Sequence, residues 1–134
     1  MAVGIAGHAP LHLSSNEARI INATTGATSW ETSTIGDIQA VGLVGDTVVA
    51  GYHRNSPNTT VPYPYFCTQL EASNGVLTTW DPKITGNQSN ADGGNNGVQA
   101  IYADPATKTI FIAGAFTQWN GTSTHKSLIA FTWT

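Results

Sequence analysis

The chain has 134 residues, of which only 10% are charged, and its formal net charge is −3. Because the five basic residues are scattered, the sequence lacks the basic patch on which nucleic acid or an acidic membrane surface would bind. The one cysteine, Cys67, excludes an internal disulfide and a cysteine-based zinc cluster.

Short hydrophobic motifs recur along the chain, as they do in repeat proteins. A β-branched residue followed by Ala-Gly occurs as Ile5-Ala6-Gly7, Val49-Ala50-Gly51 and Ile112-Ala113-Gly114. A second motif precedes two of these copies, as Ile38-Gln39-Ala40-Val41 and Val98-Gln99-Ala100-Ile101. A glycine turn followed by a tryptophan also recurs, at Gly26 before Trp30 and at Gly75 before Trp80. We interpret the two tryptophans as packing residues between repeats rather than as ligand-stacking residues.

These motifs divide the chain into three units of predicted strands. The first unit, 1–33, has strands that begin near Val3, run over 18–23 and end at Trp30. The second unit, 34–83, has four strands, at 38–44, 47–52, 66–71 and 76–80. The third unit, 95–134, has three strands, at 98–103, 109–116 and 127–133. Four antiparallel strands in roughly 40–50 residues are typical of a β-propeller blade. The sequence therefore predicts an all-β fold, a β-propeller fragment of about three four-stranded antiparallel blades that is incomplete at both ends.

The last unit also carries a resemblance to a known repeat. Residues 112–121 read Ile-Ala-Gly-Ala-Phe-Thr-Gln-Trp-Asn-Gly, and Leu128-Ile129-Ala130-Phe131 follows. This order resembles the GG-x-F-x-x-x-N-G … hydrophobic-A repeat of delta-sixty and kelch-like propellers in secreted bacterial, fungal cell-surface and phage-tail proteins. Ala113 replaces the first glycine, and the second unit departs from the pattern at Tyr52-His53. The resemblance implies a propeller in an extracellular, cell-surface or virion setting. It implies no reaction, because one fold hosts many functions.

The predicted loops are short on one face of the blades and long on the other. The long ones cover 8–17, 53–65, 82–97 and 117–126. Alternate turns of an antiparallel blade lie on opposite faces, so all four long loops gather on one face, and binding usually resides on such loops. The residues there that suit a glycan or a protein partner are Tyr63, Tyr65, Trp119, Asn120 and His125. The alternative is that these loops are solvated spacers.

The sequence carries no motif for catalysis. It contains no nucleophile elbow, phosphate-binding loop or dinucleotide glycine motif. His8 and His12 have the spacing of a helical metal pair, but Pro10 lies between them and no third ligand is near. The segment 92–97 resembles a calcium loop only faintly, because Ala103 stands where the bidentate glutamate belongs. We therefore predict no catalytic residue, no metal and no cofactor.

The sequence favours a non-catalytic β-propeller module for extracellular or virion binding and assembly, which recognises a glycan or a protein through its long-loop face. The expected partners are other blades, copies or chains that complete the propeller, but neither nucleic acid nor a membrane interior. One alternative is part of a propeller glycosidase or oxidase, whose active site lies partly in missing blades. Another alternative is a purely structural spacer of a phage tail or a cell surface.

Overall fold

The computed structural model describes residues 2–7, 16–22, 24–34, 38–52, 66–80, 82–87, 97–122 and 126–133. Across these ranges the chain forms strands and turns, and it contains no helix that could cross a membrane. The strands are β1 (Ala2–Gly7), β2 (Asn16–Asn22), β3 (Thr28–Thr34), β4 (Ile38–Val44), β5 (Thr47–Tyr52), β6 (Cys67–Glu71), β7 (Ile84–Asn87), β8 (Gly97–Asp104), β9 (Thr109–Trp119) and β10 (Leu128–Thr132). The all-β prediction is confirmed.

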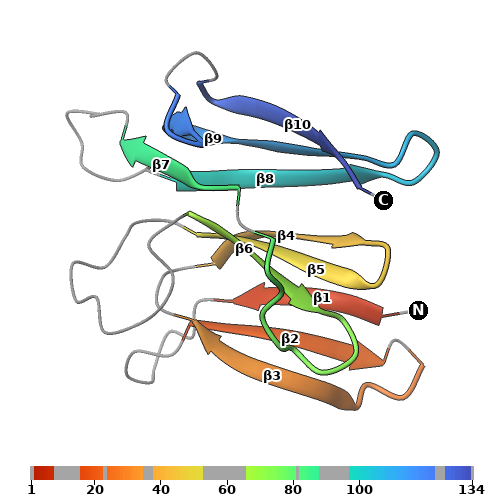
Figure 1. The fold of residues 1–134 in the computed structure, drawn as a ribbon. Helices are drawn as coiled ribbons and strands as arrows, with labels where there is room; N and C mark the ends of the chain where they lie inside the picture. Colours follow the sequence, from red (N-terminus) through yellow and green to blue (C-terminus); the bar gives the residue numbers. More distant parts are fainter. Residues whose placement is uncertain are drawn as a thin grey trace.

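The strands form three small antiparallel sheets that are stacked in chain order (Figure 1). The first sheet is β1-β2-β3 and the second is β4-β5-β6. In the third sheet β9 pairs with β8 and β10, and its far end pairs with β7. β4 lies between β1 and β8, so the sheets face one another mainly through their first strands.

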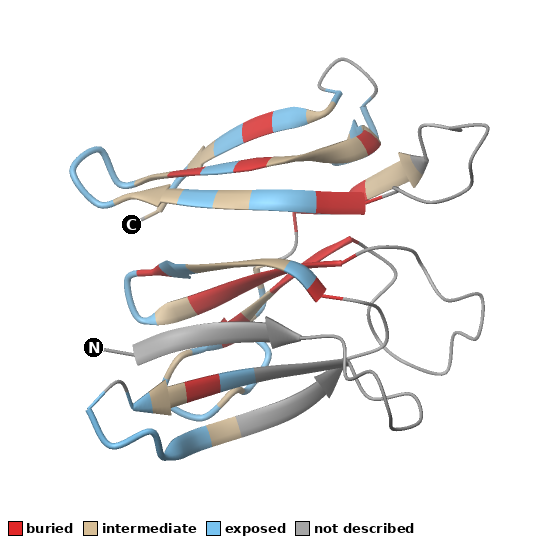
Figure 2. Ribbon diagram, turned by 180° about the vertical axis from the view of Figure 1, so that it is seen from behind, coloured by how far each residue is buried: buried red, intermediate tan, exposed pale blue. Residues whose placement is uncertain are grey.

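The burial of the central strands follows from this stacking. In the second sheet, β5 is buried at every position from Val48 to Tyr52, because a neighbouring sheet covers each of its faces. In the third sheet, β9 alternates between buried Ile110 and Ile112 and exposed Phe111, because the described chain covers only one face there. Figure 2 shows exposed residues on the short hairpin turns and along parts of the edge strands β4, β8 and β10.

The first and second sheets contain equivalent hairpin turns. In the first, Asn22 N donates to the carbonyl oxygen of Ala27 and Gly26 N donates to that of Asn22. In the second, Glu71 N donates to Val76 O and Gly75 N donates to Glu71 O. Both turns use a glycine in the left-handed region, with φ of 72° at Gly26 and 73° at Gly75. β2 and β6 are therefore equivalent strands of the repeat.

Two strands differ from the sequence prediction. The strand expected at 76–80 is reduced to one bridge, between Leu70 and Leu77. Conversely, β7 forms where a loop between units was expected. It has only four residues and contains Gly86 at φ 78°, so it shows no alternating apolar pattern. β7 also links two sheets, because Ile84 pairs with Trp119 on β9 while its carbonyl oxygen accepts a hydrogen bond from Phe66 N (3.0 Å).

The first sheet packs on the second through one apolar cluster. Ile20 is buried there with residues of β4, β5 and β6, and Trp30 lies at the edge of the cluster. The Trp30 indole nitrogen donates to the carbonyl oxygen of Ala72 (2.7 Å), and its ring covers Gly75, where a β-carbon would lie 2.7 Å from it. Trp80 likewise packs against the next sheet in chain order. Its ring meets that of Phe131 in the third sheet edge-on, with the ring centroids 5.5 Å apart. Trp30 and Trp80 both pack between neighbouring sheets, as predicted, and Trp80 in addition lines a groove between the second and third sheets.

The second and third sheets approach one another closely at two glycines. A β-carbon on Gly42 would lie 2.5 Å from Cγ2 of Ile101, and one on Gly51 would overlap the side chain of Val98. A β-carbon on Gly114 would instead overlap the backbone of Gly97 within the third sheet. Gly51 and Gly114 therefore both lack space for a side chain, but for different reasons.

The Ala-Gly motifs do not occupy the same position in the two ladders. Ala40 lies opposite Gly51, whereas the corresponding Ala100 lies opposite Ala113, one position before Gly114. The two hairpins differ as well, since 45–46 join β4 to β5 and 105–108 join β8 to β9. The motif thus lies on the central strands β5 and β9 of the second and third sheets, in different registers, whereas its first copy lies on β1 at the edge of the first sheet.

We expect Gly42→Ala to destabilise the protein by about 1–3 kcal/mol, because the new methyl group overpacks the contact with Ile101. Ile101→Ala removes the opposing methyl group, so the double variant should be more stable than the summed single effects by about 0.5–3 kcal/mol. Urea unfolding of the wild type, both single variants and the double variant measures this coupling. Strictly additive effects would contradict the direct contact between Gly42 on β4 and Ile101 on β8.

Candidate functional site

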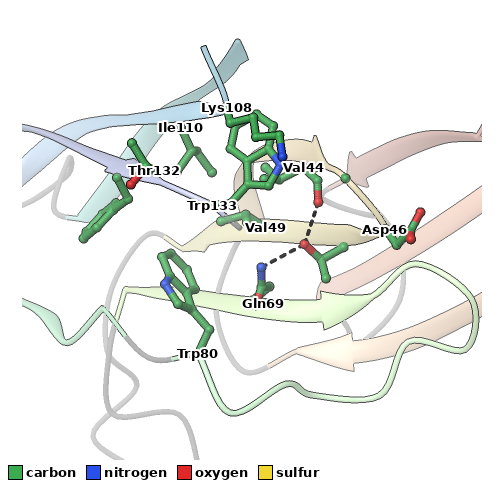
Figure 3. A pocket seen from close by; sticks show the side chains of 12 residues that line it. Val44, Asp46, Val49, Gln69, Trp80, Lys108, Ile110, Thr132 and Trp133 are labelled. Atoms are coloured by element: carbon green, nitrogen blue, oxygen red, sulfur yellow. Dashed lines mark hydrogen bonds between the residues drawn. The ribbon is translucent and has the colours of Figure 1, made fainter. Parts of the chain in front are cut away.

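An open groove of about 500 Å³ lies between the second and third sheets, at the end of the stack that carries the short hairpin turns (Figure 3). Its lining comes from segments that are far apart in the sequence. The β4–β5 hairpin and β6 form one side, together with the segment after β6, while the β8–β9 hairpin and the end of β10 form the other. The residues that matter for its chemistry are Asp46, Thr47, Gln69, Trp80, Lys108, Phe131 and Trp133.

Aromatic side chains form much of the groove surface. Phe131 is fixed between two indoles, because Trp80 and Trp119 meet its ring edge-on with centroids 5.5 and 5.4 Å away. Trp133 follows β10, and its backbone N–H donates to the carbonyl oxygen of Lys108 (3.0 Å). Its indole nitrogen lies 3.6 Å from the place that a β-carbon of Gly45 would take. Trp80 and Trp133 thus lie on opposite sides of the groove (Figure 3).

A chain of hydrogen bonds orients one amide in the groove. The Thr47 hydroxyl donates to the carbonyl oxygen of Val44 (2.8 Å), and it accepts from Nε2 of Gln69 (2.8 Å). The Thr78 hydroxyl donates to Oε1 of Gln69 (2.7 Å). Because an amide has two N–H groups and two acceptor lone pairs, Gln69 keeps one N–H and one lone pair for a further partner. The amide is held in place before any ligand arrives.

Several polar groups of the groove have no partner among the described residues. The indole N–H groups of Trp80 and Trp133 donate no hydrogen bond to the described residues. Because no buried side-chain nitrogen among them lacks a partner, both indole nitrogens are accessible from the groove or from solvent. The Asp46 carboxylate and the Lys108 ammonium group, both on exposed turns, form no ion pair in the same part of the chain. The groove therefore combines apolar rings with donors and acceptors that are free to bind a ligand.

The residues predicted from the long-loop face are only partly described. Tyr63, Tyr65 and His125 lie outside the described residues. Trp119 ends β9 rather than lying in a loop, because pairing with Ile84 extends the strand beyond its predicted end at 116. Asn120 follows it, exposed and at φ 47°, and its backbone N–H donates to the carbonyl oxygen of Lys83 (3.2 Å). Their role in ligand binding stays a prediction.

The groove has no local signature in the sequence. Its residues come from separate segments and share no motif, and Trp80 was interpreted only as a packing residue. Trp133 lacked a counterpart in the other repeats, and this was the one available signal. Among the described residues, no three His, Cys, Asp or Glu side chains gather in a way that could hold a metal ion.

Comparison with known proteins gives no relative of this chain. No protein-family model matches it, and no characterised protein or solved structure matches it significantly. The resemblance to delta-sixty and kelch-like repeats therefore rests on the residues quoted above.

The turn that carries Lys108 into the groove is held by an aspartate. Oδ2 of Asp104 accepts a hydrogen bond from the Thr107 hydroxyl (2.7 Å), and Oδ1 accepts one from Ala106 N (2.9 Å). Both bonds stabilise the charged carboxylate, and together, led by the Thr107 bond, they hold the pKa of Asp104 below its usual value. Lys108 itself takes a left-handed backbone conformation, with φ of 51°.

We expect Asp104→Asn to lower stability at pH 7 and to lose this effect in acid. A carboxyl group whose pKa falls on folding adds stability above its unfolded pKa, which is about 3.9, and that stability disappears as the pH drops through the folded pKa. Thermal melts of both proteins between pH 7 and pH 2 should therefore converge below about pH 4. A gap between the two melting temperatures that is independent of pH would rule out the two carboxylate hydrogen bonds as its cause.

Proposed function

We propose that this chain is a non-catalytic binding module that holds a saccharide in the groove between its second and third sheets. The observation that carries the proposal is the position of Trp80 and Trp133 on either side of an oriented amide, that of Gln69. A sugar ring offers C–H groups to an aromatic face and hydroxyls to hydrogen-bonding groups, and the groove supplies both. Its volume, about 500 Å³, falls within the usual range of small-molecule sites.

The charges of the groove support an uncharged ligand. Asp46 and Lys108 are its ionisable side chains and have opposite signs, so the groove selects neither an anion nor a cation. A carboxylate and an ammonium group can each bind a sugar hydroxyl, the first as an acceptor and the second as a donor. A neutral polyhydroxylated ligand uses all of these groups, whereas a purely apolar ligand would leave them without partners.

The wider proposal is that the sheets are blades of a β-propeller in an extracellular, cell-surface or virion protein. It is supported by the matching turns at Gly26 and Gly75, and by the stacking of sheets in chain order. The setting rests on the resemblance of the third unit to secreted and phage-tail repeats. The long-loop face, with Asn120, is the competing place for a ligand, and the experiment below separates the two.

The test is binding to a broad glycan array, followed by titration of tryptophan fluorescence with the best ligand. Trp133→Ala should weaken affinity at least tenfold, which corresponds to about 1.4 kcal/mol. Asp46→Asn keeps the shape of an exposed side chain, so it tests the groove without a change in packing, and it should weaken binding as well. Asn120→Gly is the matched control, because glycine accepts the φ of 47° and only the amide is lost.

Melting temperatures within a few degrees of the wild type would show that a variant is folded. Loss of binding in Asn120→Gly with normal binding in Asp46→Asn and Trp133→Ala would assign the ligand to the long-loop face. Absence of any glycan ligand for the wild-type protein would overturn the proposed function.

A further inference from the structure

The third sheet exposes an apolar face on the side away from the second sheet. Tyr102, Leu128 and Phe111 are 65%, 59% and 37% exposed. Tyr102 lies opposite Phe111 in the ladder, and their rings are stacked with centroids 6.2 Å apart. Exposed alanines, Ala100 and Ala130, fill the space beside them. Residues at the alternate positions, such as Ile110 and Ile112, point into the core, so this outer face is apolar up to its last row before the hairpin, which is polar (Asp104, Thr109 and Thr132).

This face is equivalent to one that is already covered within the chain. The third cross-strand pair from the hairpin is Gly42–Val49 in the second sheet and Tyr102–Phe111 in the third. Gln69 and Ala130 extend these pairs onto the next strand, so the two rows occupy equivalent positions in their sheets.

In the second sheet this face packs against the third sheet, with Gly42 against Ile101 and Gly51 against Val98. The third sheet therefore covers the face of the second sheet that is equivalent to its own exposed outer face.

We infer that this outer face docks a second copy of this chain, whose first sheet takes the place that the next sheet of the stack would occupy. Within the chain, the first sheet already packs against a neighbour through Ile20 and Trp30, so its other side faces away from the stack. Contact between the outer face of one copy and the first sheet of the next joins two different surfaces. Such head-to-tail contacts produce closed rings or filaments rather than symmetric dimers. This inference does not depend on the saccharide site.

Sedimentation velocity over a range of concentrations tests the association. The wild type should sediment as species larger than the 14.1 kDa monomer, in proportions that rise with concentration. Tyr102→Lys and Leu128→Glu place charges on the outer face and should each weaken association at least tenfold. Val76→Lys is the matched control, because Val76 is a comparably exposed apolar residue (55%) on the turn after β6, away from this face. A wild type that stays monomeric at all concentrations, or equal effects of all three variants, would overturn the inference.

Disulfide trapping identifies the docked surface. Arg19 is exposed and precedes the buried Ile20 on β2, in the regular part of the ladder with β3, so its side chain points away from the second sheet. A mixture of Tyr102→Cys and Arg19→Cys proteins should form a mixed disulfide dimer in excess over either homodimer. The wild-type protein, with only the buried Cys67, is the control and should form none. A dominant Tyr102→Cys homodimer would show that two outer faces meet each other, and would overturn the assignment of the first sheet as the occupant.

Discussion

The close approach of β8 to β4 and β5 is the contact on which the rest of the structure depends. Gly42 and Gly51 have no side chains, so Ile101 and Val98 of β8 can pack directly against the backbone of β4 and β5. This contact buries one face of β5 and one face of β9, and it forms the larger apolar cluster, around Val49, Ile112 and Phe116. It also sets the distance between the two hairpins whose tips border the groove. Larger residues at the glycines would separate the sheets and change core and groove together.

The recurring motifs predicted the parts of the fold that short-range sequence determines. The two Gln-Ala motifs and the second and third Ala-Gly motifs lie on β4, β5, β8 and β9, and the two glycine turns form the same pattern of hydrogen bonds. The motifs could not predict β7, because its described ladder partners are more than 25 residues away, on β9. Nor could they fix the register between β8 and β9, which depends on the length of a turn rather than on the motif itself.

The groove was beyond sequence reasoning for a related physical reason. Its chemistry depends on the meeting of Gln69, Trp80, Lys108 and Trp133, and only the stacking of two sheets brings these residues together. A loop can be recognised by its length and its polar composition, which is why the sequence pointed to the long-loop face. A groove between sheets has no such local signature. The hydroxyl of Thr47 illustrates this, since its contacts with Val44 O and Gln69 become visible only once the strands are paired.

The short strand β7 has a consequence for how the molecule comes apart. Its Ile84 is shared by two sheets, through a backbone hydrogen bond from Phe66 on one side and a ladder pair with Trp119 on the other. To pull the second and third sheets apart, main-chain hydrogen bonds must break, in addition to the loss of side-chain packing. The hydrogen bond between Trp30 and Ala72 that joins the first sheet to the second comes from a side chain. Local opening then has a preferred order, in which the first sheet exchanges its amide protons early while the other two open as a single cooperative unit.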